Sequence, residues 1–349
     1  MARQDQLGRH DSRNGGRRPR PPGPKRRQIL MTARASAAGT RRSDASPEPF
    51  RRILVTGGGG FVGRRLLARL ASTHASAQVL SPPHQGGDDE RPAMDLACAD
   101  SVRAVVKGFR PDLVIHLAGQ SSVGAGAAAG GATATWRSNG LGALNLAEAI
   151  ANEAPSATML FSSSVEVYGS AFRAGPVDET TTPLPLNTYG RSKLAAEQIL
   201  ADILPGEARL IIARPSNHSG AGQDPRFVIP AFAAQVRQRE ILVGNLDAER
   251  DFLHVEDVID AYIALLNAAP FLERREVFNV ASGRPIAIRR ILERLMDISR
   301  ADGTVTTDPA RLRPSDIPST TIDASRISSR TDWSPSRTLD DILTDVLGG

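Results

Sequence analysis

The sequence predicts an α/β fold in which helices cover both faces of a mainly parallel sheet. Short, fully apolar segments alternate with segments of helical apolar spacing over residues 51–213. Such apolar runs are typical of strands buried on both faces of a sheet, and their alternation with helices implies right-handed crossovers. Past Pro215 the alternation loosens, which predicts a smaller C-terminal lobe that binds the substrate.

The first half begins with a strand, a glycine turn and a helix. Ile53, Leu54 and Val55 form an apolar run before a glycine-rich turn, and Leu66 and Leu70 then recur at helical spacing. Further strands are expected at 78–80, 113–117, 157–161 and 210–213, and further helices at 101–109, 140–151 and 189–204.

The second half has a more irregular order of elements. We expect helices at 228–239 and 289–299 and short strands at 241–243 and 277–280. A strand followed by a helix is expected within 250–266, and the end of the chain is interrupted by prolines. Dividing the chain where the pattern loosens gives a first domain at 50–214. Residues 215–349 then form a lobe that is partly interwoven with the first domain.

Residues 1–49 form a basic segment without apolar periodicity. They carry twelve Arg and Lys against four Asp and Glu, so the net charge of +5 and the pI of 9.9 come from this segment. The remainder of the chain has a net charge of −3. Because a segment rich in Arg, Pro, Gly and Ser cannot bury enough surface to offset chain entropy, we expect a disordered tail.

Three interpretations of this tail remain open. An organelle transit peptide is disfavoured by Asp5, Asp11 and the prolines. A nucleic-acid or membrane-surface arm fits the charge alone. We favour a solvated extension, with Met31 as the actual first residue, so neither a nucleic-acid partner nor a membrane partner is expected.

The composition points to a cytoplasmic protein without disulfides or metal ions. The single cysteine, Cys98, excludes a disulfide within the chain, and the six scattered histidines have no metal-ligand spacing. No apolar run approaches the ~20 residues of a membrane-spanning helix. A reducing compartment fits these features.

The segment between the first strand and the first helix has the spacing of a dinucleotide-binding loop. Gly57, Gly60 and Gly63 recur at every third position. One such glycine permits a sharp turn off the strand, one lets the backbone approach a pyrophosphate, and one lets helix and strand pack closely. The helix start, with Phe61 and Val62, then offers free N–H groups to the phosphates. This pattern predicts a Rossmann-like first domain that binds NAD or NADP.

The end of the second strand favours NADP(H) over NAD(H). Domains that prefer NAD usually carry an acidic residue there, which binds the ribose hydroxyls. The position here is near Ser81, and the next acidic residue is Asp88. Arg64 or Arg65, just after the glycine loop, could pair with a 2′-phosphate. Alternatively, both arginines simply face solvent.

Tyr189 and Lys193 are four residues apart at the start of an expected helix and share one face of it. An ammonium group beside a phenol stabilises the phenolate and is expected to lower the tyrosine pKa toward neutral pH. The tyrosine can then exchange a proton with a substrate alcohol or carbonyl. One crossover earlier, residues 162–164 are three serines at a strand end, on the sheet edge where such folds bind ligands. An ordinary surface helix turn is the alternative.

Four segments combine into one signature: TGGGGFVG at 56–63, IHLAGQSSVG at 115–124, SSSVEVYG at 162–169 and YGRSK at 189–193. Together they closely resemble the extended short-chain dehydrogenase/reductase family that acts on nucleotide sugars, over residues 51 to about 346. The resemblance implies that Ser164, Tyr189 and Lys193 are catalytic. The cofactor contacts it implies are Gly57, Gly60, Phe61, Val62, Gly63 and Arg64 in the glycine loop, Asp95 and Leu96 at the adenine, and Leu117, Ala118 and Gly119 along the cofactor, besides Tyr189 and Lys193.

The resemblance also implies supporting roles. Asn139 would support the site from below, and Ser122 would contact the substrate. His116 is interpreted as a core histidine rather than as a catalyst. Because members of this family pair through helices around 140–150 and 189–204, a homodimer is expected.

The C-terminal half narrows the resemblance within the family. The segments that look like reductases of GDP-4-keto-6-deoxy-D-mannose, which form GDP-D-rhamnose, are 214–236, 244–262 and 311–318. By this likeness Asn217 and Arg250 bind the substrate near its diphosphate and sugar, and Arg311 or Arg313 binds the nucleotide. Arginine suits this role because its planar fork matches phosphate oxygens. A surface salt bridge for Arg250 and a solvated loop for Arg311 are the alternatives.

Glu166 leaves the type of reaction open. Related 4,6-dehydratases carry a glutamate two residues after the catalytic hydroxyl residue, where it removes the C5 proton. This chain keeps that glutamate but has Val165 where many dehydratases have a second polar group, and its glycine loop lacks the Gly-Gln-Asp-Gly run of GDP-mannose dehydratases. We therefore expect an NAD(P)H-dependent reductase in which Glu166 binds or orients. A 4,6-dehydratase or 4-epimerase with a tightly held cofactor is the alternative.

Overall fold

The computed structural model describes residues 50–121, 123–127, 129–238, 240–312 and 317–349. The expected disordered tail therefore lies outside the described residues, and so do Ser122 and Arg313. Every strand and helix that the sequence predicts is present, with bounds that differ by a few residues. Within the described residues, no helix combines the length and the apolarity that crossing a bilayer requires.

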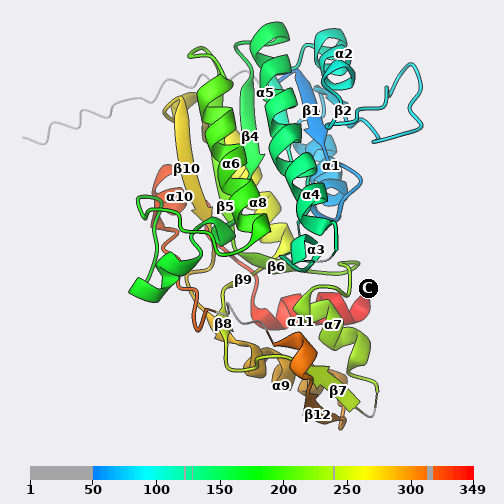
Figure 1. Cartoon of the computed structure of the whole chain (residues 1–349), viewed down its shortest axis with the longest axis vertical. Helices are drawn as coiled ribbons and strands as arrows, with labels where there is room; N and C mark the ends of the chain where they lie inside the picture. The colour runs from blue at the N-terminus through cyan, green and yellow to red at the C-terminus, as the bar shows by residue number, and fades with distance from the viewer. Residues whose placement is uncertain (1–49, 122, 128, 239, 313–316) are drawn as a thin grey trace, which may run out of the picture. The chain divides into compact units, whose positions relative to one another are not determined.

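Six parallel strands form the central sheet, in the spatial order β10-β5-β4-β3-β1-β2 (Figure 1). The order in which successive strands are added across the sheet reverses at β1, because β2 lies on one side of it and β3 on the other. In open α/β sheets this switch point is where ligands bind, beyond the carboxyl ends of the strands. The predicted fold class is thus confirmed. The strands are β1 (Arg52–Thr56), β2 (Gln78–Leu80), β3 (Leu113–His116), β4 (Thr158–Ser162), β5 (Arg209–Pro215) and β10 (Arg275–Val280).

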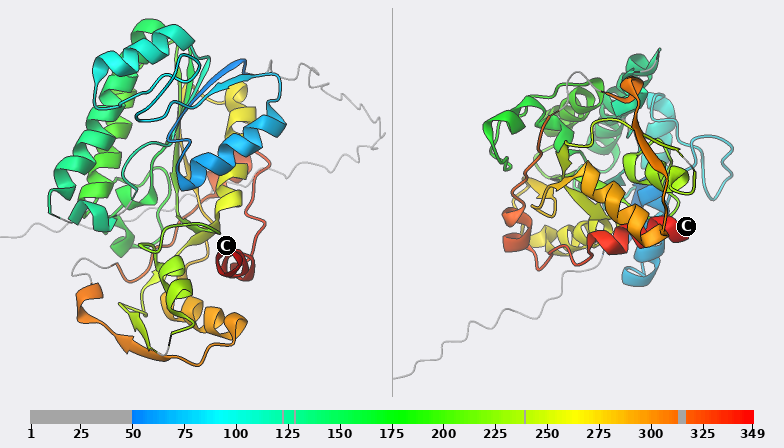
Figure 2. Two further views of the ribbon diagram at one scale, coloured as in Figure 1. Left: turned by 90° about the vertical axis from the view of Figure 1, so that its right-hand side faces the viewer. Right: turned by 90° about the horizontal axis from the view of Figure 1, so that it is seen from below.

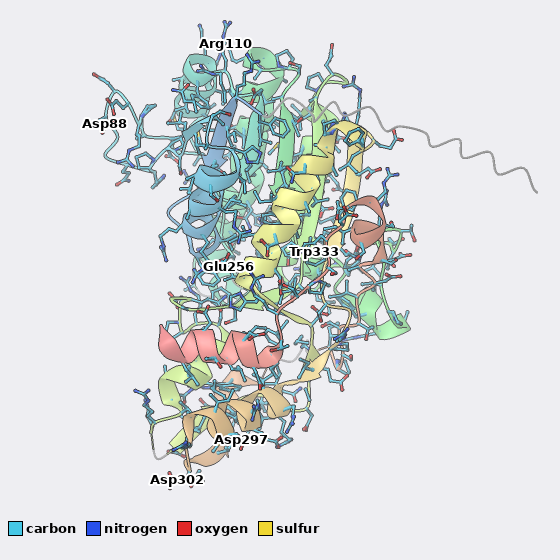
Figure 3. The ribbon with its side chains drawn as sticks, turned by 180° about the vertical axis from the view of Figure 1, so that it is seen from behind. Asp88, Arg110, Glu256, Asp297, Asp302 and Trp333 are labelled. Atoms are coloured by element: carbon cyan, nitrogen blue, oxygen red, sulfur yellow. The ribbon has the colours of Figure 1, made fainter. Side chains whose placement is uncertain are left out.

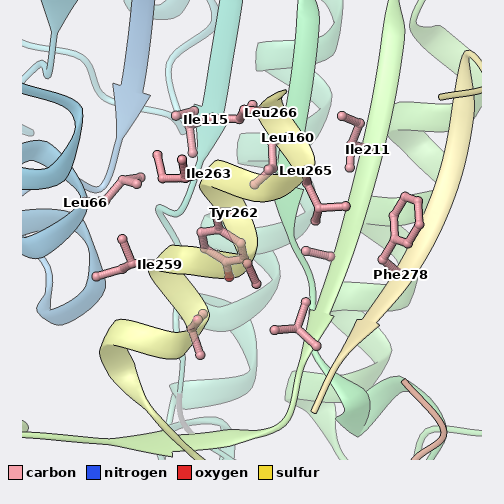
Figure 4. Packing of buried hydrophobic residues seen from close by; sticks show 14 of the residues in the cluster. Leu66, Ile115, Leu160, Ile211, Ile259, Tyr262, Ile263, Leu265, Leu266 and Phe278 are labelled. Carbon is pink, nitrogen blue, oxygen red and sulfur yellow. The ribbon is translucent and has the colours of Figure 1, made fainter. Parts of the chain in front are cut away.

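Helices cover both faces of this sheet, as the left view of Figure 2 shows. On one face Ile53 and Val55 of β1 join Leu66 and Ile259 in a buried cluster, part of which is drawn in Figure 4. On the other face Leu54 joins the second cluster. This alternation follows from the two-residue period of a strand. The helices on the first face are α1 (Phe61–Thr73) and α8 (Val255–Ala268), and those on the second are α2 (Ala99–Phe109), α5 (Gly142–Glu153) and α6 (Thr188–Ile203).

The lower lobe in Figure 1 has its own buried cluster, which includes Ile229, Phe232, Ile291 and Leu343. The second half of the chain is not confined to this lobe. It also supplies β10 to the sheet and α8 to the helices that cover one face of the sheet. The elements of the lobe are β6 (Asn217–Ser219), α7 (Val228–Gln235), β7 (Glu240–Val243), β8 (Glu249–Arg250), β9 (Phe252–His254), β11 (Ile286–Ala287), α9 (Ile288–Ser299), β12 (Thr304–Thr307) and α11 (Leu339–Gly348).

The structure adds helices where none were expected. No helix was predicted past residue 299, yet α11 closes the chain and buries Ile342 and Leu343. Thr338 begins it with a capping box, in which its hydroxyl accepts from the N–H of Asp341 and the Asp341 carboxylate accepts from the N–H of Thr338. The other short helices are α3 (Val123–Ala127), α4 (Gly131–Thr135), α10 (Ser325–Arg330), the π-helix η1 (Trp136–Leu141) and the 3-10 helices η2 (Val165–Val167), η3 (Ser170–Ala174), η4 (Ala269–Phe271) and η5 (Pro309–Arg311).

Candidate active site

The glycine loop joins β1 to α1 in a turn too tight for side chains at three positions. Gly57 has φ of 74°, and a Cβ on it would lie 2.6 Å from the backbone nitrogen of Ala118. A Cβ on Gly63 would lie 2.7 Å from Gly58 Cα, and a Cβ on Gly58 would overlap the hydroxyl of Ser81. Only glycine therefore lets the loop lie this close to β3 and to the end of β2.

The start of α1 leaves its first backbone donors uncapped. Gly60 is the N-cap residue and offers no side-chain hydrogen bond, and Phe61, Val62 and Gly63 follow it. The first N–H groups of a helix have no partner within the helix, and the helix dipole adds partial positive charge there. This loop fits the pyrophosphate of a dinucleotide, because the cradle that side chains would fill is open and lined with N–H groups.

The two arginines after the glycine loop have different partners. Arg64 is exposed and donates to the carbonyl oxygen of Gly59 over 2.8 Å. Arg65 donates to the carbonyl oxygen of Ala221 and lies 3.5 Å from Glu256, whose position at the start of α8 is labelled in Figure 3. Arg65 is thus tied to the second half of the chain, and Arg64 is the more accessible of the two.

The segment after β3 faces α6. Leu117 and Ala118 are held to Thr56, through its carbonyl oxygen at 3.2 Å and its hydroxyl at 3.3 Å. Gly119 has φ of 144°, and a Cβ on it would lie 3.8 Å from the Lys193 ammonium. The structure thus brings the end of the expected cofactor-lining segment against a predicted catalytic residue.

Asp95 and Leu96 lie in the turn that leads into α2. The Asp95 carboxylate accepts from the N–H of Ala97 over 2.9 Å, and the Leu96 carbonyl accepts from the Asn145 side chain of α5 over 2.8 Å. Both residues are half-buried. Their backbone is held by the first domain, and a contact with adenine stays a prediction.

Ser164, Tyr189 and Lys193 are all buried at the carboxyl end of the sheet, with exposed fractions of 7%, 8% and 5%. Ser164 follows β4. Its Oγ accepts from the N–H of Glu166 over 3.2 Å, and its hydroxyl lies within hydrogen-bonding reach of the Tyr189 phenol. Tyr189 is the second residue of α6, and Lys193 follows one turn later. The sequence therefore predicted correctly which side chains lie together, although the structure does not test their catalytic roles.

The pKa of Tyr189 differs from the sequence expectation. The sequence predicted that Lys193 lowers it, whereas burial and the negative charge of Glu166 raise it to about 12, against the opposing effect of the Ser164 hydroxyl. Burial also lowers the pKa of Lys193 to about 8, against the opposing charge of Glu197. Lys193 is not among the groups that shift this pKa, and its ammonium donates instead to the Ser162 carbonyl oxygen at 2.8 Å. With this raised pKa, the Tyr189 phenol carries its proton at neutral pH.

A buried hydrogen-bond chain supports the first turn of α6. The side-chain oxygen of Asn139 accepts from the N–H of Gln120 over 2.8 Å, and its amide donates to Ser192 Oγ over 2.9 Å. Ser192 Oγ in turn donates to the Tyr189 carbonyl oxygen over 2.8 Å. Asn139 thus lies beneath the site as the resemblance implied. His116 is also in the core, where burial and the charge of Lys193 lower its pKa to about 3.

Sequence reasoning missed the residues that fix the three serines after β4. Ser162 shares a hydrogen bond of 2.7 Å with the hydroxyl of Tyr262, and Ser163 donates to Glu197. Glu197 binds Arg214 through two contacts of 2.6 and 2.9 Å. No local pattern marks these partners, because they come from α8, the third turn of α6 and β5. Asn187 had a signal, since asparagine before a helical segment is a common N-cap.

The predicted substrate residues are spread over the second half of the chain. Asn217 is exposed in β6 and donates to the Asp251 carbonyl oxygen over 3.2 Å. Arg250 donates to the Ile317 carbonyl oxygen over 2.7 Å. Arg311 lies in η5, where it donates to the Leu242 carbonyl oxygen over 2.8 Å. The structure therefore does not test whether these residues form one binding site.

A family model for the NAD dependent epimerase/dehydratase family matches residues 53–281. The chain belongs to this family. The match begins in β1 and ends just after β10, so it spans the whole sheet, the glycine loop and the group around Tyr189. The family resemblance predicted from the four sequence segments is thereby confirmed, and the chain is an NAD(P)-dependent enzyme of this family.

Individual members of the family are similar over most of their length. The GDP-6-deoxy-D-mannose reductase of Pseudomonas aeruginosa is 37% identical over 85% of this chain and 96% of its own. The GDP-6-deoxy-D-talose 4-dehydrogenase of Aggregatibacter actinomycetemcomitans is 29% identical over 79% and 90%. The solved structure of RMD from Pseudomonas aeruginosa complexed with NADPH is 34% identical, covers 85% of this chain and 98% of its own, and has a TM-score of 0.74.

Proposed function

We propose that this protein reduces the C4 ketone of GDP-4-keto-6-deoxy-D-mannose with NADPH and forms GDP-D-rhamnose. The observation that carries the proposal is the buried group of Ser164, Tyr189 and Lys193 at the carboxyl edge of the sheet, where the segment 117–119 lies between the glycine loop and Lys193. The 37% identity to a GDP-6-deoxy-D-mannose reductase, over nearly the whole of that enzyme, supports this choice of substrate.

In the proposed mechanism Tyr189 is the proton donor. The nicotinamide, when bound, supplies the hydride that C4 receives. The phenol gives its proton to the C4 oxygen as negative charge develops there, and the O–H of Ser164, which lies next to the phenol, donates a hydrogen bond to the same oxygen. Lys193 is held against the Ser162 carbonyl and adds positive charge to the site. A raised tyrosine pKa suits a group that must donate a proton rather than accept one.

We propose NADPH as the preferred cofactor, with NADH as the less favoured one. Ser81 replaces the acidic residue that would bind ribose hydroxyls and repel a 2′-phosphate, and it lies directly beside Gly58. Arg64 is exposed on the glycine loop, where it is available for a phosphate. Replacing Arg64 with Gln is expected to raise the KM for NADPH and to leave that for NADH nearly unchanged. Equal effects on both cofactors would contradict this role.

For the substrate, we propose that Asn217 and Arg250 contact the sugar and its diphosphate. Asn217 is exposed immediately after the loop that follows β5, at the carboxyl edge of the sheet. Arg311, Arg313 and Ser122 remain candidates for the nucleotide and the sugar. Replacing any one of these five residues with alanine is expected to raise the KM for the GDP-sugar more than it lowers kcat.

The experiment that tests the proposal is the stoichiometry of NADPH oxidation. With the keto sugar as substrate, one NADPH is expected to disappear for each product molecule. Several UDP-glucose 4-epimerases, such as that of Yersinia pestis with 28% identity, are also similar to this chain. An epimerase or a 4,6-dehydratase that recycles a tightly held cofactor would convert sugar without net NADPH loss, and that result would replace the reductase proposal.

We also propose that the protein is a homodimer that pairs through α5 and α6. Trp136 and Leu141, in the π-helix that leads into α5, are 41% and 37% exposed, and a second copy packed there would cover them. Light scattering after size exclusion is expected to give a dimer mass. Replacing both residues with glutamate is expected to give a folded monomer, and an unchanged dimer would place the interface elsewhere.

A further inference from the structure

Asn187 connects two parts of the candidate active site. Its side-chain oxygen accepts from the N–H of Gly190 over 2.8 Å, so it caps α6. Its side-chain amide donates to the Glu166 carboxylate over 2.8 Å. One asparagine thus holds both the helix that carries Tyr189 and the glutamate that follows Ser164.

Glu166 is held against α6 through its backbone as well. A Cβ on Gly190 would lie 2.5 Å from the Glu166 carbonyl oxygen, so the two backbones touch and only glycine fits there. The N–H of Glu166 donates to Ser164 Oγ over 3.2 Å. The remaining freedom of Glu166 is in its side chain, and Asn187 restricts it.

We propose that Asn187 is a positioning residue that fixes the Glu166 carboxylate beside the Tyr189 phenol, so that the negative charge favours the protonated phenol. This proposal deepens the proposed reductase function, because a reductase needs Tyr189 as a proton donor. It also gives the retained glutamate a role other than proton abstraction from the sugar.

The residue type supports this assignment. Serine, threonine, aspartate and asparagine all cap helices well, so the cap alone does not require asparagine. Of these four, only asparagine carries its acceptor and its donor on separate atoms, so that its oxygen can cap the helix while its N–H₂ reaches a carboxylate. A charge-assisted hydrogen bond to a carboxylate is also stronger than one between neutral groups.

The groups that influence the Tyr189 phenol come from three elements. Glu166 of η2 and burial raise its pKa, and Ser164 lowers it. Lys193 lies one turn further along α6, with its ammonium on the Ser162 carbonyl oxygen. Burial is the main cause of the raised pKa of Tyr262 in α8, and the nearby charge of Tyr189 adds to it. Among these groups Glu166 is the one whose negative charge raises the pKa of the Tyr189 phenol.

Titration of the tyrosines tests this proposal without substrate. The chain has three tyrosines, Tyr168, Tyr189 and Tyr262, so fluorine NMR of the full chain labelled with 3-fluorotyrosine gives three signals, and the signal that Y189F removes belongs to Tyr189. E166Q is expected to lower the apparent pKa of this buried phenol by about one unit, the effect of removing one nearby charge on a half-buried side chain. N187S keeps an N-cap hydroxyl but releases the carboxylate, and a lowering in the same direction is expected.

The double variant distinguishes positioning from capping. Because Asn187 acts through Glu166, N187S is expected to have no further effect on the Tyr189 titration once Glu166 is glutamine. A titration in N187S identical to that of the wild type would overturn the proposal, and so would additive shifts in the double variant. If the wild-type enzyme fails to consume NADPH with the keto sugar, the reductase function is wrong, whereas this titration result still stands by itself.

Discussion

The ammonium of Lys193 donates a hydrogen bond to the backbone carbonyl oxygen of Ser162 over 2.8 Å. This carbonyl is available because the N–H of the same peptide, on Ser163, donates to Ala213 of β5. The carbonyl therefore points the other way, toward β3, whose pairing with β4 ends at Phe161. β4 continues one residue past its pairing with β3, so this carbonyl has no partner in β3, and Lys193 of α6 supplies the donor.

This placement predicts the pH dependence of reduction. Lys193 must carry its charge, and burial lowers its pKa to about 8, so the charged form is present below pH 8 and is lost as pH rises through that value. Tyr189, with its pKa raised to about 12, stays protonated throughout this range. We expect kcat/KM for the keto sugar to fall above about pH 8, measured under steady-state conditions in buffers of constant ionic strength. A flat profile up to pH 10, or a rise, would contradict it.

Replacing Tyr189 with Phe removes the proposed proton donor and keeps the ring. We expect kcat to fall by about 10²–10⁴-fold, the usual contribution of positioned proton transfer. The affinity for NADPH, measured by fluorescence titration, is expected to stay within about twofold of the wild type. A variant that keeps wild-type turnover would show that the proton comes from another group.

Gly63 and Gly59 form a matched pair for testing the cofactor loop. A Cβ on Gly63 would lie 2.7 Å from Gly58 Cα, whereas a Cβ on Gly59 would have no atom within 4 Å. Gly63→Ala must therefore deform the loop, and we expect the Kd for NADPH to rise at least about tenfold, or about 1.4 kcal/mol. Gly59→Ala is expected to bind NADPH as the wild type does. Similar losses in both variants would mean that the loop geometry described here does not govern binding.

The buried pair of Glu197 and Arg214 is expected to stabilise the fold around the serines. Both side chains are 6% exposed, so Arg214→Met would leave a buried carboxylate without its partner. We expect the free energy of unfolding in urea to fall by about 3–5 kcal/mol. Arg294→Met breaks a surface pair with Asp340, whose side chains are 36% and 51% exposed, and the loss there is expected to be much smaller. Equal losses at both sites would be inconsistent with this interpretation.

Local pattern was sufficient to predict the sheet, the glycine loop and the pairing of Tyr189 with Lys193, because each depends on the period of apolar residues or on residues close together in sequence. Ser164 was singled out from the three serines only by the family resemblance. The pattern could not reveal that Arg214 of β5 binds Glu197, or that Tyr262 of α8 binds Ser162, because these contacts exist only after the chain has folded.

The electrostatics of the site could not be predicted for a similar reason. The spacing of Tyr189 and Lys193 indicated a lowered tyrosine pKa, because charge proximity was the only effect visible in the sequence. Burial and the carboxylate of Glu166 act in the opposite direction, and both depend on packing between η2 and α6. Helix α11, at the end of the chain, was missed because its apolar face is defined by packing against α9 and β9, and this packing exists only in the folded chain.

The central claim is that hydride reaches C4 of the sugar while Tyr189 protonates the oxygen. The most direct measurement is NMR of the product formed from GDP-4-keto-6-deoxy-D-mannose with NADPH that carries deuterium at the transferred position. We predict GDP-D-rhamnose with deuterium at C4 and one NADPH oxidised for each product molecule. A product without deuterium at C4, or conversion of the sugar without loss of NADPH, would contradict the account.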